Sequence, residues 1–263
     1  MMAKIAISGK GGVGKTTLAA LLAQVYADAG RVVLAVDADP APCLAGALGF
    51  PAELRARLRP IAEMDELIEE RTGARPGTVG GFFTLNPRVD DLPERFSVVH
   101  RGVRLLEMGG VEAGGSGCIC PESALLKALV RHLLLRREDV LILDMYAGIE
   151  HLGRATVDCV DAMLVVAEPT RRSLATAAQI KALAADIGLT RLWLVGNKVR
   201  TEEDAAFLQA ESPGLPLLGL LPADPGVQEA DRLGIPVYDH VPALRQAAER
   251  IAAALEALTV GDA

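Results

Sequence analysis

The chain has 263 residues, of which 51% are hydrophobic, so it is long enough to bury a substantial core as one domain over residues 1–263. Its net charge of −7 and its 3% aromatic content argue against a nucleic-acid-binding protein, which normally presents a basic face or stacking platforms for bases. No apolar run reaches the roughly 18 residues of a membrane span, and no secretory signal precedes the first strand. We therefore expect a cytoplasmic protein without membrane insertion, whose four cysteines are thiols or metal ligands rather than disulfides.

The first motif is a glycine-rich loop between a short apolar strand, residues 2–8, and an alanine- and leucine-rich helix, residues 18–26. Residues 9–17 read GKGGVGKTT and fit the phosphate-loop pattern G-x-x-x-x-G-K-[ST]. In such a loop the backbone amides converge on an anion, Lys15 contacts the β- and γ-phosphates, and the Thr16 hydroxyl ligates Mg²⁺. The motif predicts that the protein binds a nucleoside triphosphate. The expected nucleotide contacts are Gly11, Gly12, Val13, Gly14, Lys15, Thr16 and Thr17.

A second lysine, Lys10, lies on the same loop, where it would repel Lys15 unless anionic oxygens sit close by. The run GKGGVGKT resembles the deviant phosphate loop of the MinD, ParA and nitrogenase-iron-protein superfamily of ATPases. The resemblance implies a P-loop fold of the α/β class, with a doubly wound, mostly parallel sheet flanked by helices. It also implies a homodimer in which Lys10 reaches the partner's nucleotide and takes part in catalysis. The alternative for Lys10 is a solvated lysine.

The next apolar run, residues 31–36, is typical of a buried parallel strand and ends in the sequence DADP. Carboxylates at the carboxyl end of such a strand lie where doubly wound sheets bind ligands. The superfamily resemblance implies that Asp39 orients the attacking water, which makes it a catalytic residue. The position of Asp37 two residues earlier suggests that it assists Mg²⁺ through a water. Helix capping is the alternative for both aspartates. We expect Cys43 to be a small buried apolar residue.

Residues 51–72 have a helical period and carry charges of both signs, which is typical of a solvated face or a docking surface rather than a polyanion site. Residues 73–87 are rich in glycine and proline and predict a loop. Residues 98–106 predict a hairpin-like return into another strand.

A second motif lies in a glycine-rich loop over residues 114–121, where Cys118 and Cys120 are separated by one residue. Pro121 then opens a helix that runs to residue 134, so both thiols precede a helix N-terminus, which should lower their pKa. Two cysteines are too few for a closed tetrahedral metal site, but the two-fold axis of a homodimer would supply four. The alternative for the C-x-C pair is buried structural cysteines.

Three further stretches extend the resemblance: GCICPE at residues 117–122, DMYAGIEHLGR at 144–154 and GNKV at 196–199. With them the chain is similar, nearly end to end, to the CooC-type accessory ATPases of carbon monoxide dehydrogenase, which assist nickel insertion. The resemblance implies ATP hydrolysis coupled to metal-centre assembly, with Ni²⁺ or Zn²⁺ at Cys118 and Cys120 and the carbon monoxide dehydrogenase apoenzyme as partner. Tyr146 departs from the family, whose members usually have an acidic residue there.

Asp144 ends a predicted buried strand, residues 139–144, in the Walker B arrangement, which holds Mg²⁺ directly or through water. Further strands are expected at residues 162–167, 192–195 and 217–221, and helices at 173–187 and 240–258. The superfamily resemblance implies that Asn197 hydrogen-bonds the adenine edge. Pro222 and Asp224 follow the last strand and are expected at the rim of the base pocket.

Two other functions remain open from the sequence. A partitioning or positioning ATPase like ParA or MinD would explain the phosphate loop, but it predicts a basic surface or a cationic amphipathic tail, neither of which is evident. An iron–sulfur, ATP-dependent reductase component would need a cysteine in the segment after Asp144, and residues 145–154 contain none. A C-x-C pair from two subunits could still hold a cluster.

Overall fold

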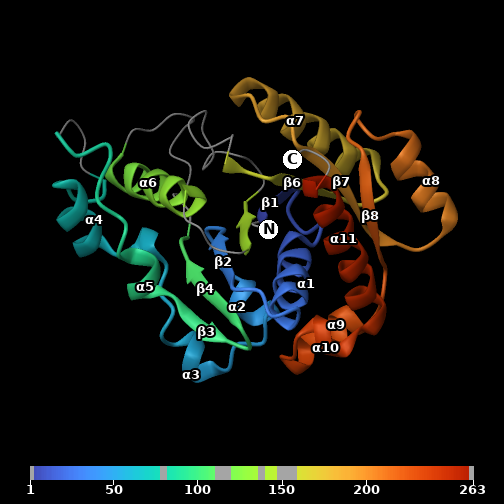
Figure 1. The fold of residues 1–263 in the computed structure, drawn as a ribbon, viewed down its shortest axis with the longest axis horizontal. Helices are drawn as coiled ribbons and strands as arrows, with labels where there is room; N and C mark the ends of the chain where they lie inside the picture. The colour runs from blue at the N-terminus through green and yellow to red at the C-terminus, as the bar shows by residue number, and fades with distance from the viewer. Residues whose placement is uncertain (1–2, 78–81, 110–119, 136–139, 147–158, 261–263) are drawn as a thin grey trace.

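The computed structural model describes residues 3–77, 82–109, 120–135, 140–146 and 159–260. Within these residues, eight strands form one sheet in the order β3–β4–β2–β5–β1–β6–β7–β8, and every neighbouring pair is parallel except β3 and β4 (Figure 1). The strands are β1 (Ala3–Gly9), β2 (Val33–Ala38), β3 (Val98–His100), β4 (Val103–Glu107), β5 (Val140–Met145), β6 (Ala162–Ala167), β7 (Leu192–Val199) and β8 (Leu217–Pro222).

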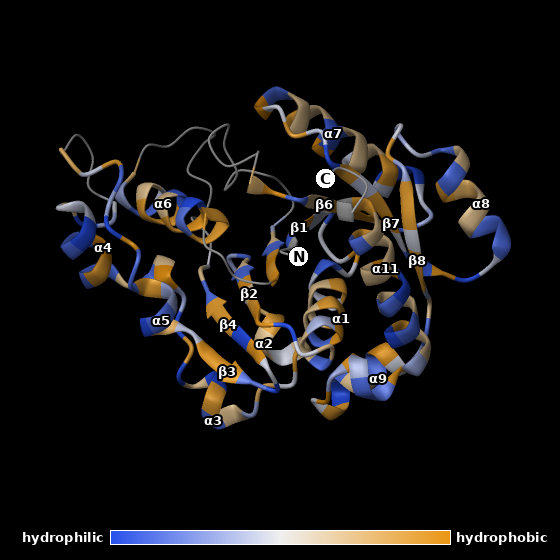
Figure 2. Ribbon diagram, viewed as in Figure 1, coloured by the Kyte–Doolittle hydropathy of each residue, from blue (hydrophilic) through white to orange (hydrophobic). Residues whose placement is uncertain are grey.

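The centre of the sheet is buried on both faces, because β2, β5 and β6 are buried at every residue. This burial explains why these strands are continuous apolar runs rather than alternating patterns. Figure 2 shows the corresponding orange strands, with hydrophilic residues on the outward sides of the flanking helices. The predicted fold class, a doubly wound and mostly parallel α/β sheet, is confirmed.

Helices cover each face of the sheet and form two separate apolar cores with it. The first face packs against α1 (Lys15–Asp28), α2 (Leu44–Ala47), α3 (Ala52–Arg55), α9 (Gly226–Leu233), α10 (Val237–His240) and α11 (Pro242–Val260). The second face packs against the 3₁₀ helix η1 (Ile61–Glu63), α4 (Asp65–Thr72), α5 (Leu92–Phe96), α6 (Pro121–Leu135), α7 (Arg171–Ile187) and α8 (Glu202–Ala210). No helix among the described residues is long and apolar enough to cross a membrane.

The predicted hairpin is confirmed as β3 and β4, which pair antiparallel at one edge of the sheet. Its two connecting residues, Arg101 and Gly102, have φ angles of 49° and 79°. Two consecutive left-handed residues are typical of a type I′ turn, whose twist matches that of the flanking strands.

The prediction of helical structure through residues 51–72 is wrong in its extent. The segment contains three short pieces, α3, η1 and α4, with no helix over residues 56–60. Pro60 precedes η1 with a ψ of 128°, which is incompatible with helix. A proline also disfavours helical geometry in the residue before it, so the periodic pattern cannot form one continuous helix.

Candidate nucleotide-binding site

The glycine-rich loop connects β1 to α1 and is held close to two neighbouring strands. A Cβ atom at Gly9, whose φ is 154°, would lie 2.5 Å from the Val166 carbonyl oxygen on β6. A Cβ atom at Gly14, whose φ is 96°, would lie 2.2 Å from the Asn197 Nδ2 atom on β7. Only glycine fits at these two positions, so the motif glycines are explained by the packing of the loop against the sheet.

The start of α1 offers unpaired backbone amides to an anion. Its N-cap is Gly14, which has no side chain to cap the helix, and the first backbone bond runs from Leu18 N to Gly14 O at 3.0 Å. The amides of Lys15, Thr16 and Thr17 therefore point out of the helix end together with the positive end of its dipole. This geometry suits the phosphate groups of a nucleotide.

The two lysines of the loop occupy different environments. Lys15 is 7% exposed, and its ammonium group donates to the Lys10 carbonyl oxygen at 3.4 Å, so its side chain folds back across the loop. The side chain of Lys10 is exposed. Lys15 thus lies along its own loop, whereas the side chain of Lys10 is accessible to another molecule.

A row of carboxylates crosses the carboxyl ends of three adjacent strands. Asp37 of β2 is in register with Asp144 of β5 on one side and with Glu107 of β4 on the other. Partners in register on parallel strands point to the same face of the sheet. Glu107 was not identified from the sequence, and burial together with the charge of Asp37 raises its pKa to about 7.

Asp37 anchors the segment that follows β2. Its side chain is fully buried, and its carboxylate accepts hydrogen bonds from Cys43 N and Leu44 N at 2.8 Å each and from Asp39 N at 3.2 Å. These bonds cap the start of α2. Helix capping was the alternative role that the sequence left open for Asp37. These three bonds leave acceptor capacity on Oδ1, so the predicted help of Asp37 to Mg²⁺ through a water stays a prediction.

Asp144 differs from Asp37, because both of its carboxylate oxygens are buried without a hydrogen-bond partner among the described residues. Burial raises its pKa to about 7, and the neighbouring Asp37 charge adds to the effect. The Thr16 hydroxyl lies near enough to lower the pKa of Asp144, although the pair does not reach hydrogen-bond geometry. An orphaned carboxylate beside a threonine hydroxyl is a suitable ligand set for Mg²⁺, so the residues present fit the metal.

The remaining residues of this segment, Asp39 and Cys43, lie at the surface of the same site. Asp39 is half-buried, and its Oδ1 atom accepts from Ala41 N at 2.9 Å. The prediction that Cys43 is a buried apolar residue is wrong, because this residue is exposed. Its amide is turned inward to Asp37, which leaves the side chain outside. Partial burial and the charges of Asp37 and Asp39 raise the pKa of the thiol.

The end of β7 holds the glycine-rich loop in place. The Nδ2 group of Asn197 donates to the Val13 carbonyl oxygen at 2.6 Å, and its Oδ1 atom accepts from Lys198 N at 2.8 Å. The ammonium group of Lys198 donates to the Gly12 carbonyl oxygen at 2.8 Å and forms a close ion pair with Glu168. Lys198 and Glu168 were not identified from the sequence. The contact of Asn197 with adenine stays a prediction.

Replacing Asn197 with alanine is expected to weaken ADP binding by roughly tenfold or more. The substitution leaves the buried Val13 carbonyl without its partner, which costs about 1–3 kcal/mol, and frees the loop to leave its binding geometry. Titration with a fluorescent ADP analogue measures the effect, with the exposed amide Gln228→Ala as control. Equal affinities for the two variants would contradict a holding role for Asn197.

Pro222 and Asp224 lie beside the end of β7. Ala223 N donates to the Val199 carbonyl oxygen at 2.8 Å, and the Asp224 Oδ1 atom accepts from Gly226 N at 2.8 Å as the chain turns into α9. Asp224 thus stabilises the turn that leads into α9. The contact of Pro222 and Asp224 with a base stays a prediction.

Of the C-x-C pair, Cys118 lies outside the described residues. Cys120 is half-buried and immediately precedes α6, whose first backbone bond runs from Ala124 N to the Cys120 carbonyl oxygen at 3.0 Å. The predicted helix beginning at Pro121 is confirmed. The described part of one chain contains no group of three or more potential metal ligands among His, Cys, Asp and Glu.

Comparison with known proteins places this site in a family. Residues 4–237 match the family model described as the CobQ/CobB/MinD/ParA nucleotide binding domain. The carbon monoxide dehydrogenase accessory protein CooC of Rhodospirillum rubrum is 48% identical over 252 residues, which cover 96% of this chain and 95% of that protein. An uncharacterised ATP-binding protein of Methanocaldococcus jannaschii is also 48% identical, over 89% of this chain and 90% of its own length.

Solved structures show the same fold at lower identity. The MinD cell division protein of Aquifex aeolicus matches with a TM-score of 0.68 and 22% identity, over 97% of each chain. The septum site-determining protein MinD of Pyrococcus horikoshii, in complex with Mg-ADP, matches with a TM-score of 0.68 and 24% identity, over 100% of this chain and 99% of that one. The chain therefore belongs to the CobQ/CobB/MinD/ParA family of P-loop ATPases and, within it, to the group that contains CooC.

Proposed function

We propose that this protein is an ATP-dependent metallochaperone that assists nickel insertion into carbon monoxide dehydrogenase. The observation that carries the proposal is the 48% identity, over 96% of the chain, to a protein named as the accessory protein of that enzyme. The alignment spans 252 residues and so extends well past the nucleotide site.

The nucleotide half of this function uses groups described above. Lys15 and the amides at the start of α1 bind the phosphates, and Asp39 orients the attacking water. The Thr16 hydroxyl and the Asp144 carboxylate are the groups that would hold Mg²⁺, which supplies charge neutralisation on the phosphates when bound.

The metal half requires two copies of the chain. In the proposed homodimer each subunit contributes Cys118 and Cys120, so four thiolates enclose one ion, and Lys10 contacts the nucleotide of the partner. ATP controls the arrangement by favouring the closed dimer. Moving an equilibrium from mostly open to mostly closed needs about 5.5 kcal/mol, and charge-assisted bonds to the γ-phosphate contribute roughly 1.5–3 kcal/mol each, so a few bonds per subunit suffice.

The proposed ion site is tested by titrating Ni²⁺, and separately Zn²⁺, into the protein with ATP or ADP. We expect one ion per two chains, and we expect Cys118→Ser and Cys120→Ser each to weaken binding by roughly 100-fold, because thiolate ligands dominate such a site. The matched control is Cys159→Ser, a half-buried cysteine outside the motif. Unchanged affinity in the two motif variants, or equal loss in the control, would exclude this metal site.

A partitioning role draws less support. The likeness to MinD structures lies at 22–24% identity and concerns the fold, whereas the CooC protein of Rhodospirillum rubrum, named as an accessory protein of a metalloenzyme, is 48% identical. Co-sedimentation with DNA or with anionic liposomes in the presence of ATP separates the two functions, and we expect neither to carry the protein to the pellet.

A further inference from the structure

A groove of about 400 Å³ lies between the α4 region and α5. These helices lie on the side of the molecule where β3 forms the edge of the sheet (Figure 1). We call it the α4–α5 groove. It is lined by residues of η1, α4 and α5, together with Arg59 just before η1. None of the predicted nucleotide or metal contacts lines it, so the proposed function leaves it unused.

The floor of the α4–α5 groove is apolar. Met64 and Leu67 reach it with 8% and 6% of their surfaces exposed, and the half-buried ring of Phe96 completes it. All three side chains also pack on the core beneath the second face of the sheet. The floor is therefore fixed by the fold and offers a contact for an apolar side chain.

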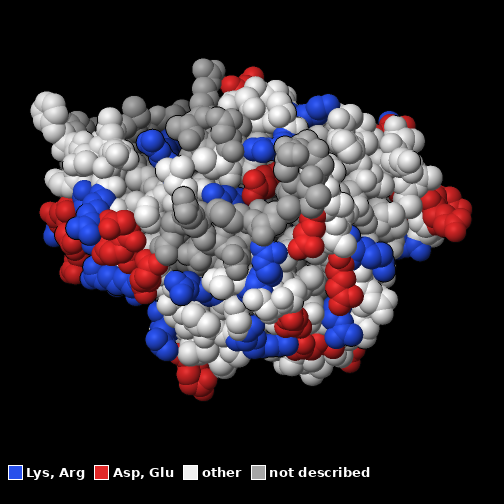
Figure 3. All heavy atoms as spheres, viewed as in Figure 1, with Lys and Arg blue, Asp and Glu red and all other residues white. Residues whose placement is uncertain are grey.

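The rim of the groove is charged and predominantly acidic. It carries the carboxylates of Glu63, Asp65, Glu66 and Glu70 and the guanidinium groups of Arg59 and Arg95, all exposed. Figure 3 shows this concentration of charge on the side of the molecule where α4 and α5 lie.

The two rim arginines already have contacts inside the groove. The Arg95 guanidinium lies 4.9 Å from the centre of the Phe96 ring, and Arg59 donates to the Glu63 carbonyl oxygen at 3.2 Å. Among the described residues, the carboxylates of Glu63, Asp65 and Glu66 form no ion pair within 4.0 Å. The rim charge that is available to a ligand is therefore negative.

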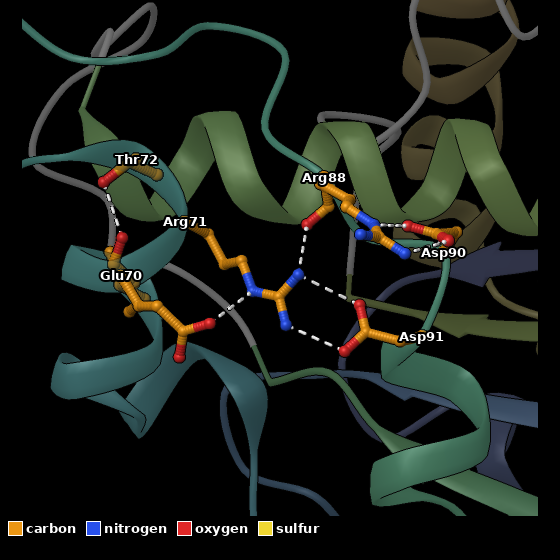
Figure 4. Close-up of polar contacts among 7 residues, drawn as sticks. Glu70, Arg71, Thr72, Arg88, Asp90 and Asp91 are labelled. Carbon is orange, nitrogen blue, oxygen red and sulfur yellow. Dashed lines mark hydrogen bonds and ion pairs between the residues drawn. The ribbon is translucent and has the colours of Figure 1, made fainter.

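The walls of the groove are held at a fixed spacing. Arg71 of α4 reaches Asp91, at the start of α5, through two bonds of 3.0 and 2.8 Å, and it donates to the Arg88 carbonyl oxygen at 3.4 Å (Figure 4). The Arg71 side chain is only 12% exposed. A groove whose walls are already braced loses little entropy when a ligand enters it.

A chain of backbone hydrogen bonds connects the groove to the candidate nucleotide site. Ala62 N of η1 donates to the Met108 carbonyl oxygen at 3.0 Å, and Met108 N donates to the Asp37 carbonyl oxygen at 2.8 Å. Asp37 in turn anchors the segment that carries Asp39. Backbone hydrogen bonds thus link η1, which lines the groove, to the end of β2 at the candidate nucleotide site.

We propose that the α4–α5 groove docks a segment of a partner protein in which lysine or arginine side chains flank a large apolar side chain. The apolar side chain would occupy the floor of Met64, Leu67 and Phe96, and the basic side chains would pair with the free rim carboxylates. Charge complementarity selects this occupant: an acidic segment or a nucleic acid would be repelled by the same rim. The inference does not depend on which metal the protein handles.

The test uses a fluorescein-labelled peptide of about 12 residues with alternating arginine and leucine, measured by polarisation against the full chain. We expect saturable binding that Glu63→Lys/Glu66→Lys weakens by roughly tenfold or more, since reversed charge on the rim repels the peptide. Glu63→Gln/Glu66→Gln, which removes the charge and keeps the side-chain size, is expected to give a smaller loss in the same direction. A peptide with serine in place of leucine is expected to bind weakly.

The control for net charge is Glu53→Lys/Glu202→Lys, which makes the same charge change on α3 and α8, outside the groove. We expect this variant to bind the peptide within about twofold of wild type at moderate ionic strength. Equal loss in the control and rim variants, equal binding of the serine peptide, or no saturable binding to wild type would overturn the proposal. ATP hydrolysis should persist in all these variants, so a failure here is distinct from a failure of the nucleotide site.

Discussion

Replacing Lys10 with alanine is expected to lower the rate of ATP hydrolysis by about 10³-fold while nucleotide affinity changes by less than about threefold. The expected size follows from cations supplied in trans to a phosphoryl-transfer site, which accelerate the reaction by about 10³–10⁵. The structure explains why the rate of hydrolysis should fall while nucleotide affinity is kept. Lys15 is 7% exposed and folded across its own loop, whereas Lys10 is exposed. Lys15→Ala should instead lose both binding and hydrolysis.

Mixing two inactive variants tests whether Lys10 acts across a dimer. One variant carries Lys10→Ala, and the other carries Asp39→Ala, which removes the residue proposed to orient the water. If Lys10 acts in trans, a mixed dimer contains one complete site, formed by Asp39 of one subunit and Lys10 of the other, and activity returns to roughly a quarter of wild type in an equal mixture of freely exchanging subunits. A mixture that stays inactive despite subunit exchange would contradict action in trans.

The parts of the fold that the sequence predicted well are those set by local pattern. The strand–loop–helix unit around Lys15, the buried strand ending in Asp144 and the helix opening at Pro121 each have a signature within a few residues, and each is present in the structure. The order of the strands brings the carboxyl ends of β1, β2 and β5 side by side. Motifs that were separate in the sequence thereby meet at one edge of the sheet.

The residues missed in the site depend on contacts that are distant in sequence. Glu107 joins the carboxylate row only because β4 pairs with β2, and Lys198 reaches the glycine-rich loop only because β7 ends beside it. The exposure of Cys43 likewise follows from the bond between its amide and Asp37. A carboxylate directly after the predicted strand, which was placed at residues 98–106, was the available signal for Glu107, and the left-handed φ of Lys198 leaves no local signature.

Replacing Asp144 with asparagine is expected to stabilise the nucleotide-free protein near pH 8 and to lower Mg²⁺-dependent hydrolysis by about 10²-fold or more. The carboxylate is buried without a hydrogen-bond partner among the described residues, so its charge is destabilising in the absence of metal. Its pKa is raised from 3.8 to about 7, a difference that corresponds to about 4 kcal/mol. Asparagine keeps the shape of the side chain and removes the charge.

The sign of the pH dependence follows from the direction of that shift. Between about pH 4 and pH 7 the folded protein keeps a proton on Asp144 that the unfolded chain has released, so the contribution of this group to stability falls as pH rises through that window. The gain in melting temperature from Asp144→Asn should therefore be large near pH 8 and should shrink toward pH 4. Thermal unfolding of the wild type and of Asp144→Asn between pH 4 and pH 8 measures this gain in melting temperature. A gain independent of pH would contradict the raised pKa of Asp144.

Magnesium should make the wild type melt at a higher temperature than Asp144→Asn, which is the reverse of the order expected without metal. A divalent cation with a nucleotide neutralises the buried carboxylate, so Mg²⁺ with ADP is expected to raise the melting temperature of the wild type much more than that of Asp144→Asn near pH 8. Near pH 5.5 the proton competes for the same oxygens, and the wild type should need more Mg²⁺ to reach the same stabilisation. Burial also raises the pKa of Asp37, but its carboxylate accepts from three backbone amides, so Asp37→Asn should remove part of the cap on the following segment together with the buried charge. Equal Mg²⁺ stabilisation of wild type and Asp144→Asn would mean that the ion is held elsewhere, and the orphaned carboxylate would then need another explanation.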